Sequence, residues 1–281
     1  MIDLHTHTNQ SDGSDAPERI PELAAAVGCT AVAVTDHDLL DGIGRARSRG
    51  DELGVRVVAG CELSCGTVWG SAHVLAYFVD DAAGPLPDVL GRLQGWREER
   101  NRRLAARLGE LGLPVTYEEI EAEAGAQGVG RPHVAAVLVR KGVVSSVQQA
   151  FDEWLDKGRP AYVARHRLEL AEAVALIHAS GAVAVLAHPL SLNLDPPELD
   201  GAVAEMAAAG LDGVEAVYGR YAPDVRGMLT AMARRHGLVP TGGSDYHGTY
   251  KPDLRVGVGR GDLDVADDVL DELEARRPPD S

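Results

Sequence analysis

Two pairs of residues that commonly bind metal ions lie near the two ends of the chain. His5 and His7 are separated by one residue, and Asp12 follows in a glycine-containing segment. Asp245 and His247 repeat this spacing near the other end. Because strand side chains alternate between two faces, residues two apart point to the same side. Since imidazole nitrogens and carboxylate oxygens bind divalent metal ions, each stretch indicates part of a metal site.

Four further residues of these types lie at or near the ends of predicted strands: His37, Glu62, His73 and His188. Asp36 precedes His37, where it is expected to support the site or cap a helix. In parallel βα folds the carboxyl ends of the strands meet at one face, where active sites form. Six histidines with several carboxylates exceed the four to six ligands of one ion. We therefore expect two or three metal ions.

Alternating apolar runs and helical patterns predict the elements that position these residues. Strands are expected at 1–8, 30–38, 55–64, 72–80, 181–189, 212–219 and 238–248. Helices are expected at about 17–27, 40–53, 168–180, 198–209 and 223–236. Asp15 and Glu18 have the spacing of a capping box, with Pro17 in the first helical turn. This alternation predicts an α/β protein with parallel strands.

The middle of the chain differs from both flanks. From about residue 86 to 165 strand signals are weak and helical signals are strong. We therefore expect an α/β domain in two parts, 1–85 and 166–281, with a helical insertion or subdomain at 86–165 between them.

Charge and cysteine content limit the function classes. A net charge of −16 disfavours binding to long DNA or to a membrane surface. Three cysteines without a C-x-x-C pair argue against a disulfide framework, and we find no signal peptide or membrane-span pattern. We expect a soluble cytoplasmic protein whose small phosphorylated substrate is bound with the help of divalent metals.

The stretches "DLHTHTNQSDGS", "AVTDHD", "GCELS", "AHP" and "GSDYHG" resemble the signature motifs of the polymerase and histidinol phosphatase (PHP) superfamily. This resemblance implies a distorted (β/α)7 barrel with a trinuclear site. It assigns one ion to His5, His7, Glu62 and Asp245, a second to Asp12, His37 and His247, and a third to Glu62, His73 and His188. The residue types leave manganese, iron and zinc equally open.

The middle segment resembles the stand-alone phosphoesterases of this superfamily, through "VGRPHVAAVLV" at 129–139 and "KGRPAYV" at 157–163. Those enzymes act on 3′,5′-nucleoside bisphosphates, and some relatives remove nucleotides from the 5′ ends of short RNA. The resemblance implies that Arg131 and His133 contact the substrate phosphate. The planar guanidinium of arginine suits bidentate binding of phosphate oxygens.

Four functions follow as alternatives. The first is a nucleoside 3′,5′-bisphosphate phosphatase, and the second is a 5′→3′ exonuclease on short RNA. The third is a histidinol-phosphate phosphatase, and the fourth is a metal-binding regulatory module without turnover. His166, His178 and His236 are interpreted as structural, and Cys61 and Cys65 as small buried residues.

A basic helix predicted in the middle segment has two possible interpretations. Its arginines are Arg97, Arg100, Arg102, Arg103 and Arg107. Interleaved glutamates favour a solvated face with helix ion pairs over a guide for an RNA tail.

Overall fold

The computed structural model describes residues 1–81, 84–125, 129–164 and 167–279 of the chain. It divides into two compact units. The first consists of Met1–Leu90 and Arg167–Ser281, and the second of Gly91–His166. His166 itself lies outside the described residues. None of the helices within the described ranges is long and apolar enough to cross a membrane.

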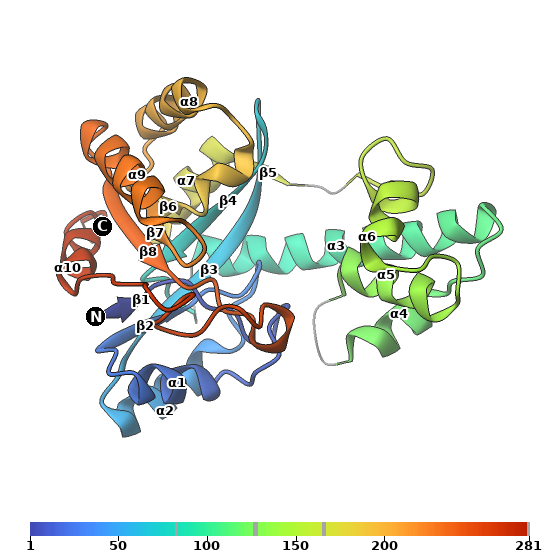
Figure 1. The fold of residues 1–281 in the computed structure, drawn as a ribbon, viewed down its shortest axis with the longest axis horizontal. Helices are drawn as coiled ribbons and strands as arrows, with labels where there is room; N and C mark the ends of the chain where they lie inside the picture. Colours follow the sequence, from blue (N-terminus) through green and yellow to red (C-terminus); the bar gives the residue numbers. More distant parts are fainter. Residues whose placement is uncertain (82–83, 126–128, 165–166, 280–281) are drawn as a thin grey trace. The chain divides into compact units, whose positions relative to one another are not determined.

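A nearly closed sheet forms the centre of the first unit (Figure 1). Its strands are β1 (Ile2–Asp3), β2 (Ala31–Val34), β3 (Arg56–Thr67), β4 (Gly70–Tyr77), β6 (Val183–Leu186), β7 (Gly213–Tyr218) and β8 (Val239–Gly243), in that order. A short eighth strand, β5 (Leu168–Glu169), pairs with β3. The first and last strands approach each other, since Leu4 N–H donates to the Gly242 carbonyl at 3.1 Å. This architecture confirms the distorted (β/α)7 barrel.

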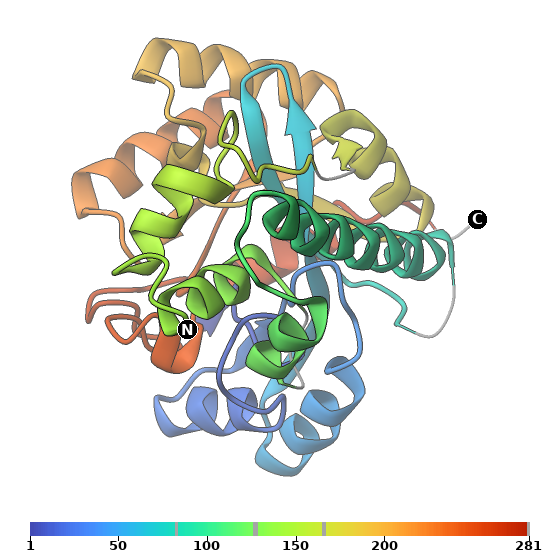
Figure 2. The same ribbon diagram turned by 90° about the vertical axis from the view of Figure 1, so that its right-hand side faces the viewer.

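The direction of β4 corrects the expectation of parallel strands throughout. β4 pairs antiparallel with both β3 and β6. Only Val68 and Trp69 connect β3 to β4, and so short a connection permits a hairpin but no helical crossover. The hairpin is visible as two long adjacent strands in Figure 2. Its register pairs His73 with Ser64, two residues beyond Glu62.

Helices lie outside the sheet (Figure 1). They are α1 (Arg19–Ala26), α2 (Ile43–Leu53), α7 (Leu170–Ala179), α8 (Pro196–Ala208), α9 (Pro223–Arg235) and α10 (Asp268–Glu274). The predicted capping box before α1 is wrong: Glu18 is the N-cap, and it makes no side-chain cap hydrogen bond. The Asp15 carboxylate instead accepts a hydrogen bond from Tyr246 at 2.5 Å. Side chains such as Leu4, Val185 and Val239 form a buried core.

The second unit is helical, as predicted for the middle of the chain. Its helices are α3 (Pro85–Glu110, which starts in the first unit), α4 (Tyr117–Ala124), α5 (Arg131–Arg140), α6 (Val147–Ala150) and a π-helix (Phe151–Leu155). Leu108, Ile120 and Leu138 are fully buried in its own core. On α3, Arg102 pairs with Glu98 at 2.7 Å, as expected for a solvated face. Arg100 is an exception on this helix, because it is buried.

Candidate metal centre

The nine residues predicted to bind metal ions lie on segments that run through or follow the barrel strands. Residues 5–12 follow β1, His37 follows β2, Glu62 lies within β3 and His73 within β4. The other three residues, His188, Asp245 and His247, follow β6 and β8. Two isolated parallel bridges continue the sheet here, Thr6 with Tyr246 and His37 with Glu62. Backbone pairing therefore brings together segments that are more than 200 residues apart in the chain.

Glu62 occupies the middle of this histidine cluster and is almost fully buried. Its Oε1 lies 2.8 Å from His73 Nδ1 and 2.9 Å from His188 Nε2. Its Oε2 lies 3.1 Å from His7 Nε2, 3.3 Å from His37 Nδ1 and 3.4 Å from His5 Nε2. Burial raises the pKa of this carboxyl, but the surrounding histidines, His37 foremost, hold the pKa well below its ordinary value. An ionised carboxylate facing five imidazoles is suited to bridging metal ions.

Asp245 directs one oxygen into the cluster. Its Oδ1 lies 3.5 Å from Nε2 of both His5 and His7, and 3.3 Å from His247 Nδ1. Burial raises the pKa of Asp245, but nearby positive groups, His5 first, lower it below the ordinary value overall. β8 approaches closely here: a Cβ added to Gly243 would lie 2.5 Å from the His5 backbone nitrogen. Glycine is therefore required beside His5.

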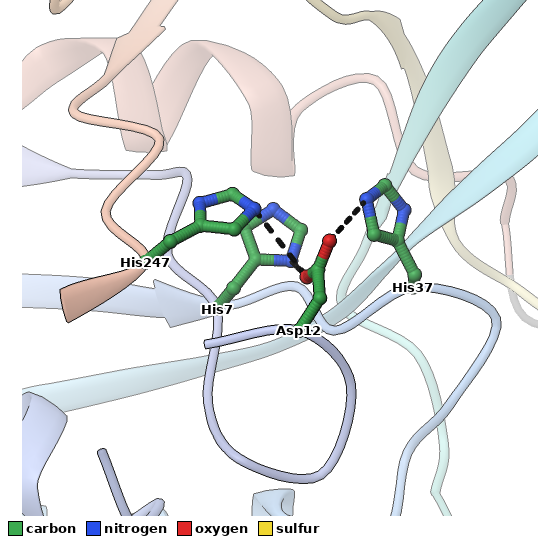
Figure 3. Close-up of side chains that lie close together, drawn as sticks. All are labelled: His7, Asp12, His37 and His247. Atoms are coloured by element: carbon green, nitrogen blue, oxygen red, sulfur yellow. Dashed lines mark ion pairs between the residues drawn. The ribbon is translucent and has the colours of Figure 1, made fainter. Parts of the chain in front are cut away.

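Asp12 lies between His247 and His37, as Figure 3 shows. Its Oδ1 lies 3.3 Å from His247 Nε2, and its Oδ2 lies 3.5 Å from His37 Nε2. The ring of His7 lies behind this carboxylate, with Nδ1 3.5 Å from Oδ1. These four side chains can surround one ion.

Within the described residues, three groups of side chains could each hold a metal ion. They are His7, Asp12, His37 and His247; His5, His7 and Asp245; and His37, Glu62 and His73. The ligand atoms within each group lie within 4.8 Å of one another. His188 joins the cluster through Glu62, although it falls in none of the three groups. All nine predicted residues are therefore brought together.

The hydrogen bonding of His7 and His37 and the protonation of His7 fit a metal site. Nδ1 of His7 and Nδ1 of His37 are buried and make no hydrogen bond within the described part of the chain, although each has a carboxylate oxygen within 3.5 Å. Burial, together with the neighbouring His247, lowers the pKa of His7 to about 3. A neutral imidazole with an unused nitrogen is the form that binds a metal. Such a buried nitrogen would be unfavourable without a ligand.

Backbone strain is concentrated at the same place. Asp38, His188 and Asp245 have positive φ angles of 53°, 25° and 54°. Residues other than glycine rarely adopt this backbone conformation. Such strain is retained where the surrounding structure holds it for function.

Arg131 and His133 lie at the start of α5 in the second unit. Arg131 donates to the Val163 carbonyl at 3.1 Å, and its guanidinium lies 5.0 Å from the centre of the Tyr162 ring. His133 Nδ1 accepts from Gly130 N–H at 3.0 Å. Their contact with a substrate phosphate stays a prediction.

The histidines interpreted as structural have carboxylate partners outside the cluster. His178 Nε2 lies 2.7 Å from Asp212, and His236 Nε2 lies 2.9 Å from Asp200. Cys61 and Cys65 are buried free thiols, as predicted.

Three residues beside the cluster were not anticipated: Glu215, Tyr218 and Lys251. Glu215 is fully buried and lies 2.8 Å from His5 Nδ1. The available signal was a glutamate inside the otherwise apolar strand "GVEAVY". Tyr218 and Lys251 both contact Asp245 Oδ2, and neither position has a recognisable local pattern.

Known proteins support the interpretation of this site. The PHP domain pattern matches residues 3–188. A 5′-3′ exoribonuclease of Haemophilus influenzae is 31% identical over 268 residues, which are 95% of this chain and 96% of that protein. A 3′,5′-nucleoside bisphosphate phosphatase of Chromobacterium violaceum is 30% identical, with 99% of each chain covered.

A solved structure agrees with the sequence comparison. It is a metal-dependent phosphoesterase of Bifidobacterium adolescentis, with a TM-score of 0.81, 30% identity, and coverage of 99% of this chain and 96% of that one. The barrel and its histidine cluster define a metal-dependent phosphoesterase, a hydrolase of phosphate esters. More specifically, the chain belongs to the PHP domain family.

Proposed function

We propose that this protein hydrolyses a nucleoside 3′,5′-bisphosphate to a nucleoside monophosphate and phosphate. The observation that carries the proposal is the gathering of nine side chains of ligand type into one cluster that includes Glu62 and Asp12. The Chromobacterium violaceum phosphatase, similar over 99% of both chains, supports the substrate class.

We assign the nine side chains to three divalent ions of manganese, iron or zinc. One set is His5, His7, Glu62 and Asp245; another is Asp12, His37 and His247; the third is Glu62, His73 and His188. When bound, such ions supply a water of lowered pKa and offset charge on the phosphoryl oxygens. The groups defined by distance differ from these sets: they add His7 to the second and His37 to the third, and they lack Glu62 in the first and His188 in the third. The rings of His7 and His37 each lie between two neighbouring sets, so assigning either ring to the other set still leaves three metal ions.

The protein's own residues have three tasks in this proposal. Glu62 and Asp12 hold the histidines of adjacent sets at fixed spacing. Arg131 and His133 bind the phosphate oxygens, since a guanidinium is a planar double donor. The helical segment 86–165, which carries both, covers the substrate.

A second candidate function is 5′→3′ removal of nucleotides from short RNA. The Haemophilus influenzae exoribonuclease, similar over 95% of this chain, favours it. The net charge of −16 opposes binding of long nucleic acids but permits a substrate of a few nucleotides.

Three buried free thiols favour a reducing compartment, so we place the protein in the cytoplasm.

The test compares adenosine 3′,5′-bisphosphate with a short 5′-phosphorylated RNA in the presence of Mn²⁺. We expect faster phosphate release from the bisphosphate than nucleotide release from the RNA. His5→Ala should abolish turnover, whereas His178→Ala should leave it nearly intact, because His178 bonds to Asp212 away from the cluster. Turnover of neither substrate by the Mn²⁺-loaded protein would exclude both functions.

A further inference from the structure

Glu215 is a fully buried carboxylate in β7, and each of its two oxygens has a different partner. Oε1 lies 2.8 Å from Nδ1 of His5. Oε2 accepts a hydrogen bond from the backbone N–H of His188 at 2.7 Å. One side chain therefore connects the segment after β1 with the segment after β6. Both connected residues belong to the proposed ligand set, yet Glu215 does not.

The contact with Glu215 determines which nitrogen of His5 carries its proton. A carboxylate oxygen accepts hydrogen bonds, so in this contact His5 Nδ1 is the donor to Oε1. A histidine ring that binds a metal ion must be neutral, so with the proton on Nδ1 its lone pair is on Nε2. That nitrogen faces the cluster, 3.1 Å from His7 Nε2 and 3.4 Å from Glu62 Oε2.

We propose that Glu215 is a positioning residue that holds His5 in the tautomer able to bind a metal through Nε2. It also fixes the His188 backbone, whose φ of 25° is one of the strained angles at the site. Carboxylates that accept from the second nitrogen of a histidine ligand orient the ring and raise its basicity. This inference rests on the proposed role of His5 as a metal ligand.

An isosteric change separates tautomer control from simple packing. In Glu215→Gln the amide oxygen must face the His188 backbone N–H, because that group can only donate. The amide NH2 then faces His5 Nδ1 and forces it to accept. The proton of the neutral ring moves to Nε2, and that nitrogen can no longer bind a metal. Glu215→Ala removes the acceptor but imposes no tautomer, so it should harm metal binding less.

Asp212, which immediately precedes β7, provides a matched control. Its Oδ2 accepts from the Ala184 backbone N–H of β6 at 2.8 Å and lies 2.7 Å from His178 Nε2. This carboxylate also joins a histidine to the β6 segment, but it contacts none of the nine clustered residues in the described hydrogen bonds. Asp212→Asn therefore measures the general cost of neutralising such a carboxylate.

The experiment measures Zn²⁺ affinity by competition with a chromophoric chelator. We expect Glu215→Gln to weaken the affected Zn²⁺ site by about tenfold or more, Glu215→Ala to weaken it less, and Asp212→Asn to leave it unchanged. Wild-type affinity in Glu215→Gln would overturn the proposal. A larger loss in Glu215→Ala than in Glu215→Gln would also overturn it, because packing alone would then explain the effect.

A second measurement uses the unaltered protein and does not depend on a variant folding. Nitrogen NMR of ¹⁵N-histidine in the Zn²⁺-loaded protein reports which ring nitrogen of His5 carries a proton. A proton on Nδ1 supports the proposal, and a proton on Nε2 overturns it.

His5→Ala separates failure of this inference from failure of the proposed metal site. Loss of Zn²⁺ in His5→Ala with full retention in Glu215→Gln would contradict the role of Glu215 alone. Full Zn²⁺ retention in His5→Ala would contradict the assignment of His5 as a ligand.

Discussion

Lys251 Nζ lies 2.5 Å from Oδ2 of Asp245, on the side of the carboxylate that faces away from His5 and His7. Tyr218 donates to the same oxygen at 2.7 Å. With Oδ2 occupied twice, only Oδ1 is directed at the imidazoles. The two donors therefore present Asp245 to the cluster through a single oxygen.

Removing these donors should weaken metal binding. We expect Lys251→Met and Tyr218→Phe each to lower Zn²⁺ affinity several-fold, and the double variant to lower it by about tenfold or more. The reason is that the freed carboxylate can rotate away from its ligand position. Chelator competition measures the change. Lys141→Met, which removes a lysine paired with Glu119 in the second unit, is the control and should bind Zn²⁺ normally. Unchanged affinity in the double variant would contradict this role.

The sequence contained enough information to predict that these residues lie together, because the relevant signals are local. His5 and His7, like Asp245 and His247, are two residues apart beside apolar strands, and strand alternation places each pair on one side. The alternation of strand and helix patterns predicted an α/β protein, and the resemblance to the PHP superfamily implied the barrel. The direction of β4 departs from the parallel pattern because its connection to β3, Val68 and Trp69, is too short for the crossover that parallel strands need.

Glu215 could not be assigned from sequence for a different physical reason. Its partners, His5 and His188, are 210 and 27 residues away, and their approach depends on strand order and register. A glutamate in a buried strand indicates that a partner exists but does not identify it. The capping box failed similarly, because Asp15 bonds to Tyr246 from the other end of the chain.

Among the proposed ligands, substitution of Glu62 should cause the largest loss of bound metal, because its two oxygens face five imidazoles. We expect Glu62→Gln to retain fewer metal equivalents after dialysis than His73→Ala or His188→Ala, which each remove one contact of Oε1. The physical reason is that an amide carries no charge and turns an NH2 group toward rings that require an acceptor. Elemental analysis measures the retained metal.

The control for this prediction is Glu272→Gln, which neutralises a carboxylate that pairs with Arg234 on the surface. It should retain the wild-type metal content. If Glu62→Gln retained as much metal as His73→Ala, the central role of Glu62 would be wrong.

Asp36 should control the loop that carries Asp12. Its carboxylate accepts from Thr8 N–H at 2.8 Å, from the Thr8 hydroxyl at 2.7 Å and from the Ser11 hydroxyl at 2.5 Å. Asp36→Ala removes all three of these hydrogen bonds. Asp12 is partly exposed, so its position depends on the loop that they hold in place. We expect the variant to lose about one metal equivalent and most of its activity.

Elemental analysis and phosphate release measure these two effects of Asp36→Ala. Asp253→Asn, which alters a surface carboxylate paired with Arg220, serves as the control. Full metal content with normal activity in Asp36→Ala would show that the loop holds Asp12 without this carboxylate.

Cys29 should make stability depend on pH in alkaline solution. Burial foremost, and then the charge of Asp3, raises the pKa of this thiol from 9.0 to about 11. Below pH 9 the thiol is protonated in both the folded and the unfolded protein, so its contribution to the free energy of unfolding is complete. Between pH 9 and 11 the unfolded chain ionises first, and stability falls as pH rises.

Urea unfolding of wild type and Cys29→Ala at pH 7.5 and pH 10 tests this dependence. The substitution removes the titrating group, so all other ionisations cancel in the comparison. The free energy of unfolding of wild type should fall by about 1 kcal/mol more than that of Cys29→Ala. An equal fall in both proteins would mean that the Cys29 thiol ionises as readily in the folded state as in the unfolded chain.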